Sequence, residues 1–213
     1  MYMTGGKKLM SILSRIFARS RKSKLTIGIL GAPNAGKTTL ANRISNECGN
    51  GTPLGDVSPI PHETRDVVAL EHCTVSDHSG SIDLTVVDTP GIATSVDYRE
   101  FQSFGLSRQE SIERAKEATR GVIKAIQSLD KLDAAIVVVD AARAPFDQIN
   151  WTVLGNLEAR NIPLIVAANK TDLPEADTSL VEETFQSAII PISAKEGSGM
   201  NELYGSILSI AST

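Results

Sequence analysis

Cysteines are few, long apolar runs are absent, and each shortage narrows what the chain can be. Cys48 and Cys73 lack metal-ligand spacing with any of the three histidines, and two such thiols suit a reducing cytosol. No segment approaches the roughly 18 apolar residues of a membrane span. The apolar stretch near the N-terminus is interrupted by Ser14 and Arg15, which makes it a poor secretory signal. A cytoplasmic protein is therefore expected.

Acidic residues are missing from the first 24 positions, which carry seven lysines and arginines. The whole chain of 213 residues has a net charge of −4, so residues 25–213 are strongly acidic. An acidic body argues against broad nucleic-acid binding by that body. The length suggests one domain, or one domain with an appendage.

Apolar runs of strand length alternate with helical segments. The predicted strands cover residues 25–30, 67–75, 82–87, 134–140, 162–168 and 189–192. The predicted helices cover residues 36–45, 107–129, 146–159, 178–186 and 199–209. Only the second and third strands resemble a hairpin. The pattern predicts an α/β fold with a mostly parallel six-stranded sheet, one antiparallel edge strand and helices on both faces. The run from Ala135 to Val139 is apolar throughout, so we expect both faces of that strand to be covered.

The helix predicted over residues 107–129 begins with a capping-box pattern, Ser107 followed by Glu110. Its apolar residues recur at helical spacing, and we expect them to face the core: Ile112, Ala115, Val122, Ile123, Ile126 and Leu129.

Residues 31–38 fit the phosphate-binding pattern G-x-x-x-x-G-K-T, between a predicted strand and a predicted helix. Glycines let backbone N–H groups turn toward a polyanion, and the helix N-terminus adds its positive dipole end. Lys37 supplies charge to the terminal phosphates, and the Thr38 hydroxyl can ligate Mg²⁺. The predicted binding residues here are Asn34, Ala35, Gly36, Lys37, Thr38 and Thr39.

Asp88 ends the third predicted strand, about 50 residues after the phosphate loop, and begins the run Asp-Thr-Pro-Gly. A carboxylate at that end of a strand can hold Mg²⁺ through water. Gly91 leaves its N–H free to approach a terminal phosphate. In the preceding loop, about residues 46–66, the hydroxyl of Thr64 can complete the Mg²⁺ shell only when a third phosphate is present.

Asn169, Lys170 and Asp172 follow the fifth predicted strand and predict guanine selection. A carboxylate only accepts hydrogen bonds, and guanine presents two adjacent donors that adenine lacks. Asn169 can bond other polar atoms, and the Lys170 stem can cover the base. Backbone N–H groups of Ser193, Ala194 and Lys195, after the last strand, can bond the guanine carbonyl.

These five motifs occur in the order of the translation-factor-type small GTPases, and the Asp-Thr-Pro-Gly form resembles the Era group of that superfamily. The resemblance covers about residues 25–211, and the chain is similar to the stand-alone Era-like GTPases of archaea. It implies GTP binding, Mg²⁺, and hydrolysis of GTP to GDP and phosphate. It implies metal contacts from Thr38, Thr64 and Asp88, and catalytic roles for Lys37, Thr64, Gly91 and Asn34.

Three features depart from that group. Glu63 precedes Thr64 where many relatives have threonine, which puts the alignment of Thr64 in question. The chain ends soon after the last helix, so we expect no room for an RNA-binding KH domain. Residues 92–132 exceed a minimal second switch, and their extra helix is expected to serve a partner or reshape the switch.

Ile92 follows Gly91, where the Ras-type pattern has a water-positioning glutamine. We therefore expect slow hydrolysis that draws on another group. Asn34 matches an asparagine that helps bind K⁺ in several relatives, and a K⁺-stimulated GTPase is our hypothesis. The alternative for Asn34 is a loop-shaping role.

Residues 1–24 are expected to form a basic amphipathic arm, and residues 25–213 the GTPase domain. The arm can contact a membrane surface peripherally, RNA or a partner protein, or fold back as a tail. An effector protein and a GTP-dependent homodimer are further partners that the resemblance allows. The alternative function is a GTP-dependent regulatory module that does not hydrolyse.

Overall fold

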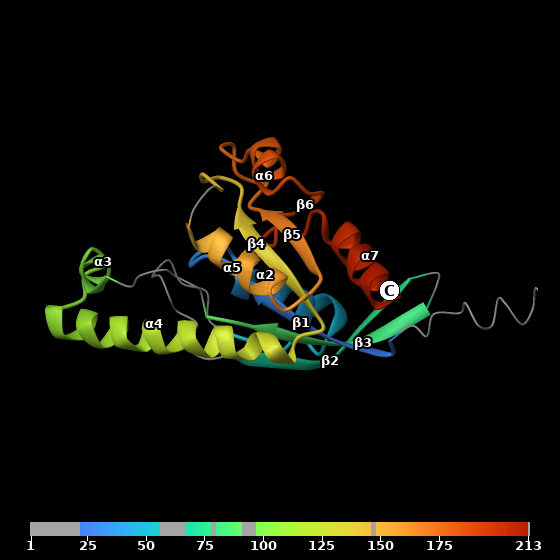
Figure 1. Ribbon diagram of the computed structural model, residues 1–213, viewed down its shortest axis with the longest axis horizontal. Helices are drawn as coiled ribbons and strands as arrows, with labels where there is room; N and C mark the ends of the chain where they lie inside the picture. The colour runs from blue at the N-terminus through green and yellow to red at the C-terminus, as the bar shows by residue number, and fades with distance from the viewer. Residues whose placement is uncertain (1–21, 56–66, 78–79, 91–96, 146–147, 213) are drawn as a thin grey trace, which may run out of the picture.

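A six-stranded sheet forms the centre of the protein (Figure 1). The computed structural model describes residues 22–55, 67–77, 80–90, 97–145 and 148–212. The strands are β1 (Lys24–Leu30), β2 (Val68–Asp77), β3 (Gly80–Asp88), β4 (Ala134–Asp140), β5 (Leu164–Asn169) and β6 (Ile189–Pro191). They lie in the order β2-β3-β1-β4-β5-β6, and only the edge strand β2 runs antiparallel to its neighbour. The predicted fold is confirmed.

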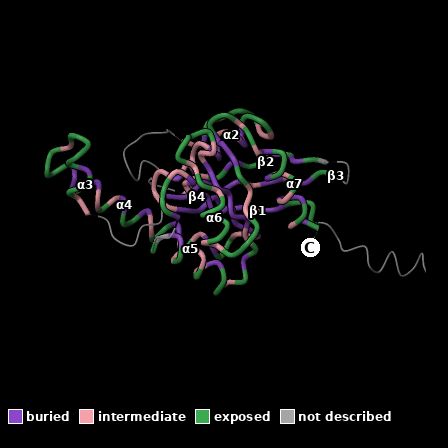
Figure 2. The backbone as a smooth tube through the Cα atoms, turned by 90° about the horizontal axis from the view of Figure 1, so that it is seen from above, coloured by how far each residue is buried: buried purple, intermediate pink, exposed green. Residues whose placement is uncertain are grey.

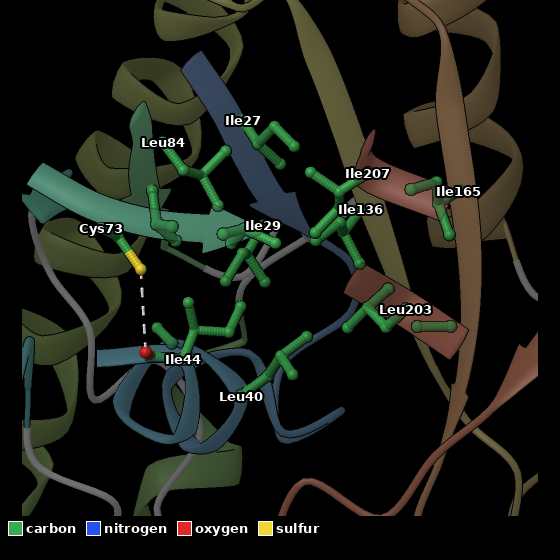
Figure 3. Close-up of a cluster of buried hydrophobic side chains, with 14 of the residues drawn as sticks. Ile27, Ile29, Leu40, Ile44, Cys73, Leu84, Ile136, Ile165, Leu203 and Ile207 are labelled. Atoms are coloured by element: carbon green, nitrogen blue, oxygen red, sulfur yellow. Dashed lines mark hydrogen bonds between the residues drawn. The ribbon is translucent and has the colours of Figure 1, made fainter. Parts of the chain in front are cut away.

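Helices cover both faces of this sheet. They are α2 (Lys37–Cys48), α3 (Tyr98–Gln102), α4 (Arg108–Ser128), α5 (Gln148–Glu158), α6 (Thr178–Phe185) and α7 (Met200–Ala211), with a 3₁₀ turn at Leu129–Lys131. One buried cluster joins α2 and α7 to the sheet through residues such as Leu40, Ile44, Leu203 and Ile207 (Figure 3). A second cluster joins α5, α6 and the end of α4 to the other face.

Strand β4 shows why a run of apolar residues predicts a covered strand. Ile136 and Val138 belong to the first cluster, while Ala135, Val137 and Val139 belong to the second. Successive side chains of a strand point to opposite faces, so both faces here must be apolar. Figure 2 shows burial concentrated in the strands, with exposed residues on the helices around them.

The end of α2 and the presence of α3 differ from the sequence predictions. Helix α2 continues to Cys48, so the following loop starts after residue 48 and not near residue 46. Backbone N–H groups of Gly49 and Gly51 both bond the Ser45 carbonyl, which ends the helix at the first glycine. Helix α3 was not predicted; it has only five residues and is capped by Asp97, whose side chain accepts from the Arg99 N–H.

Helix α4 confirms the capping box but corrects its predicted core face. The Ser107 hydroxyl accepts from the Glu110 N–H, and the Glu110 carboxylate accepts from the Ser107 N–H. Of the predicted core residues, Leu129 is buried and Val122 packs on the second cluster, but Ile123 is 52% exposed. The buried positions of α4 itself are Ser111, Arg114, Ala118, Gly121 and Ala125. The face turned inward thus carries mostly small residues, because the first part of α4 packs on α3 and projects beyond the sheet (Figure 1). Among the described helices, none is long and apolar enough to cross a membrane.

Candidate nucleotide-binding site

The carboxyl ends of four parallel strands bring the predicted site residues to one edge of the sheet. β1 runs into the phosphate loop, β3 ends at Asp88, β4 at Asp140 and β5 at Asn169. Strand pairing sets Ile29 beside Asp88 and Asp140 beside Asn169. Ligands of open α/β sheets bind outside this edge, and the sequence predictions fall on it for the same reason.

Glycines allow the phosphate loop to pass close to its neighbours. Gly31 has φ +141, and a Cβ there would lie 2.3 Å from the Val138 carbonyl oxygen. Gly36 has φ +99, and a Cβ there would lie 2.2 Å from the side-chain nitrogen of Asn169. Gly36 is also the N-cap of α2 and makes no side-chain cap. The start of α2 therefore offers backbone N–H groups and a positive dipole end to an anion.

Lys37 lies buried at the start of α2, with 6% of its surface exposed. Its Nζ donates to the Ala32 carbonyl oxygen at 2.8 Å, so the ammonium group folds back over the phosphate loop. Burial lowers the pKa of Lys37 to about 8, while nearby Asp88 acts in the opposite direction. A polyanion in the loop would favour the charged lysine and offset its burial.

Asp88 and Thr38 form a polar pair at the same place. The Thr38 hydroxyl donates to Asp88 Oδ2 at 2.8 Å. Asp88 Oδ1 is buried and has no hydrogen-bond partner among the described residues. Burial raises the pKa of Asp88, and the bond from Thr38 and the charge of Lys37 oppose that rise. A hydroxyl and an unpaired carboxylate oxygen are hard oxygen donors that fit Mg²⁺.

Asn169 joins the phosphate loop to the segment after β6. Its Nδ2 donates to the Ala35 carbonyl at 2.8 Å, and its Oδ1 accepts from the Ala194 N–H at 2.9 Å. Only 3% of its surface is exposed. The predicted base-reading asparagine thus also holds the phosphate loop to the segment after β6.

Asp172 lies at the exposed side of the same group. Ser193 Oγ donates to Asp172 Oδ1 at 2.7 Å, and this bond is the main cause of the lowered pKa of Asp172. The carboxylate is therefore charged and oriented, as an acceptor for two base donors must be. The Lys195 side chain is exposed, whereas Ser193 and Ala194 are buried.

Sequence reasoning missed two residues beside this site. Asp140 Oδ2 lies 2.6 Å from Lys170 Nζ and orients the lysine stem. Lys170 itself has φ +70. Arg43, on α2, donates from Nε to the Ala194 carbonyl at 3.1 Å. The position of Asp140 at the end of an apolar run was a usable signal, while nothing local to Arg43 indicated its partner.

Of the remaining predicted site residues, two lie in or beside the phosphate loop and two are not described by the structure. Thr64 and Gly91 lie outside the described residues. Asn34 lies in the phosphate loop with φ 62, a conformation that asparagine tolerates better than most residues. Thr39 lies in the first turn of α2 and is half-buried.

Comparisons with known proteins agree with this geometry. A family model described as 50S ribosome-binding GTPase matches residues 26–170. GTPase Der of Lactobacillus delbrueckii subsp. bulgaricus is 26% identical over 196 residues, covering 87% of this chain and 39% of Der. The tRNA modification GTPase MnmE of Bordetella petrii is 30% identical over 207 residues, covering 93% of this chain and 37% of MnmE.

A solved structure shares the fold. Era in complex with MgGDPNP and nucleotides 1506–1542 of 16S ribosomal RNA superposes with a TM-score of 0.67 and 25% identity. The match covers 89% of this chain and 57% of that one. The chain thus spans less than two fifths of the length of the two curated relatives above.

Proposed function

The chain belongs to the family of 50S ribosome-binding GTPases, enzymes that hydrolyse GTP to GDP and phosphate, and we propose that residues of one sheet edge perform each part of this reaction. The observation that carries the proposal is a convergence. Lys37, the Thr38–Asp88 pair and the Asn169–Asp172 segment meet at the carboxyl ends of parallel strands. A kinase that acts on a small substrate would have no role for the Asn169–Asp172 segment, which fits a guanine base.

The phosphates bind the loop and the start of α2 in this proposal. Backbone N–H groups from residues 34–39 surround the phosphate oxygens, and Lys37 adds a positive charge. Thr38 and Asp88 would hold Mg²⁺, with Thr64 as a further ligand when the third phosphate is present. The metal ion supplies neutralisation of the charge that develops on the phosphates. Gly91 senses the third phosphate.

The base binds between the β5 and β6 segments. Asp172 accepts hydrogen bonds from the ring N–H and the amino group of guanine, and its lowered pKa keeps it charged. The Lys170 stem, held by Asp140, covers the base. Of the three backbone N–H groups predicted to bond the guanine carbonyl, the Ser193 N–H donates to the Ser198 carbonyl and the Ala194 N–H donates to Asn169. The Lys195 N–H therefore takes this role in the proposal. Adenine would leave the Asp172 carboxylate unpaired, which selects against ATP.

Hydrolysis is slow in this proposal and is stimulated by K⁺. The Ile92 side chain cannot hydrogen-bond to water, so hydrolysis must draw on another group. Asn34 provides a side-chain oxygen in the phosphate loop that suits a monovalent cation. A cation there would act as an arginine finger does in other GTPases.

Single-turnover hydrolysis of GTP with Mg²⁺, in KCl and in NaCl, tests both the slow hydrolysis and its stimulation by K⁺. We expect faster turnover in KCl, and Asn34→Ala should remove the difference between the two salts. Equal turnover in the two salts contradicts the K⁺ part alone. Asp172→Asn should shift preference from GTP to xanthosine triphosphate, and an unchanged preference for GTP contradicts the base-reading role.

The domain organisation is part of the proposal. Residues 25–213 form the GTPase domain, in which residues 92–132 extend the second switch through α3 and α4. Residues 1–24 serve as a basic arm for an RNA, membrane or protein contact of a cytoplasmic switch. Flotation with anionic liposomes, and RNA binding, each measured with and without residues 1–24, separate these contacts. A pull-down with GDP-bound and GTP-analogue-bound protein tests for an effector and for self-association.

A further inference from the structure

Arg43 connects the phosphate-binding helix to the loop after β6. Its Nε donates to the Ala194 carbonyl at 3.1 Å, and its Nη2 donates to the Lys195 carbonyl. A Cβ on Gly197 would lie 3.2 Å from Arg43 Nη1, so the guanidinium also lies close against this loop. One side chain therefore fixes two successive carbonyls to the helix that begins at Lys37.

The third guanidinium nitrogen of Arg43 is oriented from the other side. Arg43 Nη1 lies 3.6 Å from Glu47 Oε1, and the Tyr204 hydroxyl of α7 donates to Glu47 Oε2 at 2.7 Å. The Arg43 side chain is 29% exposed. A planar guanidinium can serve two carbonyls and a carboxylate at once, which the single ammonium of lysine cannot reproduce.

Holding a carbonyl also sets the direction of the next N–H. The peptide unit is planar and trans, so the Ala194 C=O and the Lys195 N–H point in opposite directions. Arg43 draws the Ala194 carbonyl toward α2. The Lys195 N–H must then point away from Arg43. The Ala194 N–H already donates to Asn169, which leaves the Lys195 N–H as the better donor for a base.

We propose that Arg43 is a positioning residue for guanine recognition: it aims the Lys195 N–H at the 6-carbonyl of the base. This inference rests on the proposed function of the site. It adds the residue that holds the carbonyl-reading segment in place. Asp172 reads the ring N–H and the 2-amino group, whereas the segment that Arg43 holds reads the 6-carbonyl.

Release rates of three nucleotides, GDP and two analogues, each with a fluorescent label on the ribose, separate the two readers. Inosine diphosphate keeps the 6-carbonyl and the ring N–H and lacks the 2-amino group. 2-Aminopurine riboside diphosphate keeps the 2-amino group and lacks the 6-carbonyl and the ring N–H. Loss of one well-placed hydrogen bond in Arg43→Met should speed release of GDP and inosine diphosphate by about tenfold each. Release of 2-aminopurine riboside diphosphate should stay within about twofold. Arg43→Lys should lie between Arg43→Met and the unsubstituted chain.

Arg160→Met is the matched control, because Arg160 makes similar bonds far from the base. Its Nε donates to Asp130 at 2.9 Å, its Nη1 donates to the Asn156 carbonyl at 3.1 Å, and its side chain is 30% exposed. Arg160→Met should leave all three release rates unchanged.

Two results overturn the inference about Arg43. Equal acceleration of all three nucleotides by Arg43→Met means general loosening, and unchanged GDP release means a purely structural contact. Failure of the proposed function looks different: the unsubstituted chain would not bind GDP, or Asp172→Ala would leave GDP release unchanged.

Discussion

Replacing Asn169 by alanine tests whether the nucleotide site is already assembled without nucleotide. The side chain joins the Ala35 carbonyl to the Ala194 N–H inside the protein, with bonds of 2.8 and 2.9 Å. Asn169→Ala leaves both backbone groups without this partner. Each orphaned buried group costs about 1–3 kcal/mol, and water entering the vacated space recovers part of that cost. We therefore expect the nucleotide-free protein to lose about 3 kcal/mol of unfolding free energy.

Urea unfolding of the nucleotide-free protein, followed by circular dichroism, measures this loss. With a slope of about 2 kcal/mol per molar urea, the midpoint should fall by about 1.5 M. Asn169→Asp should be at least as damaging, because a carboxylate cannot donate to the Ala35 carbonyl.

Asn156→Ala serves as the control for this series. Asn156 Nδ2 donates to the Thr152 carbonyl on α5 at 2.8 Å, in a partly buried position on the helix. Alanine also favours the helix, so the change should stay below about 1 kcal/mol. A midpoint for Asn169→Ala within about 0.3 M of the unsubstituted protein would refute the reasoning, because the two bonds would then add nothing before nucleotide binds.

Three further predictions concern other parts of the protein. Asp88→Asn should stabilise the nucleotide-free protein, since burial raises the pKa of this carboxyl and disfavours its charge, as thermal unfolding will show. The same change should remove the Mg²⁺ dependence of GTP affinity, measured by titration with and without Mg²⁺. Retained Mg²⁺ dependence would contradict the assignment of Asp88 as a metal ligand. The neighbouring Cys73 lowers the pKa of Cys48 to about 7. Alkylation of Cys48 by iodoacetamide should therefore rise steeply between about pH 6 and 8, while the fully buried Cys73 stays unmodified. Peptide mass spectrometry reads both sites, and preferential labelling of Cys73 would be the contrary result. Ser107→Ala should cost about 1 kcal/mol through loss of the capping box on α4, and no change in urea midpoint would show that the start of α4 does not unfold together with the core.

Local sequence patterns predicted β4 and the start of α4 correctly. The apolar run of β4 predicted a strand buried on both faces, because parallel strands under two helix layers have no polar face. The capping box predicted the start of α4 for a similarly local reason. The predicted core face of α4 was right for Leu129, which is buried, and for Val122, which packs on the second cluster, and wrong for Ile123, which faces solvent. The first part of α4 packs on α3, a five-residue helix with no periodicity to detect.

The site divides in the same way. Lys37, Asp88 and Asn169 belong to short motifs placed at strand ends, so their convergence followed from the predicted sheet. Arg43 lies 151 positions from its partner Ala194, and no spacing rule connects the two. Asp140 needed the register of β4 against β5 before its partner Lys170 could be assigned. Tertiary contacts of this kind are visible only in the folded chain.

Asn169 and Arg43 hold opposite sides of one residue, which has a measurable consequence. Asn169 accepts from the Ala194 N–H, and Arg43 donates to the Ala194 carbonyl. If either contact alone keeps the segment in place, the second substitution should lower the unfolding free energy more than the same substitution does in the unsubstituted protein. If the first substitution already releases the segment, the second should lower the unfolding free energy less. Contacts that share a residue couple by about 0.5–3 kcal/mol. Because the Asn169 bond is the more buried, we expect Asn169→Ala to release the segment, so that Arg43→Met costs less in its background. Urea unfolding of the two single variants and the double variant, without nucleotide, gives this coupling. Additivity within about 0.3 kcal/mol would mean that the phosphate loop and the base loop are held independently, contrary to the joint assembly inferred from these contacts.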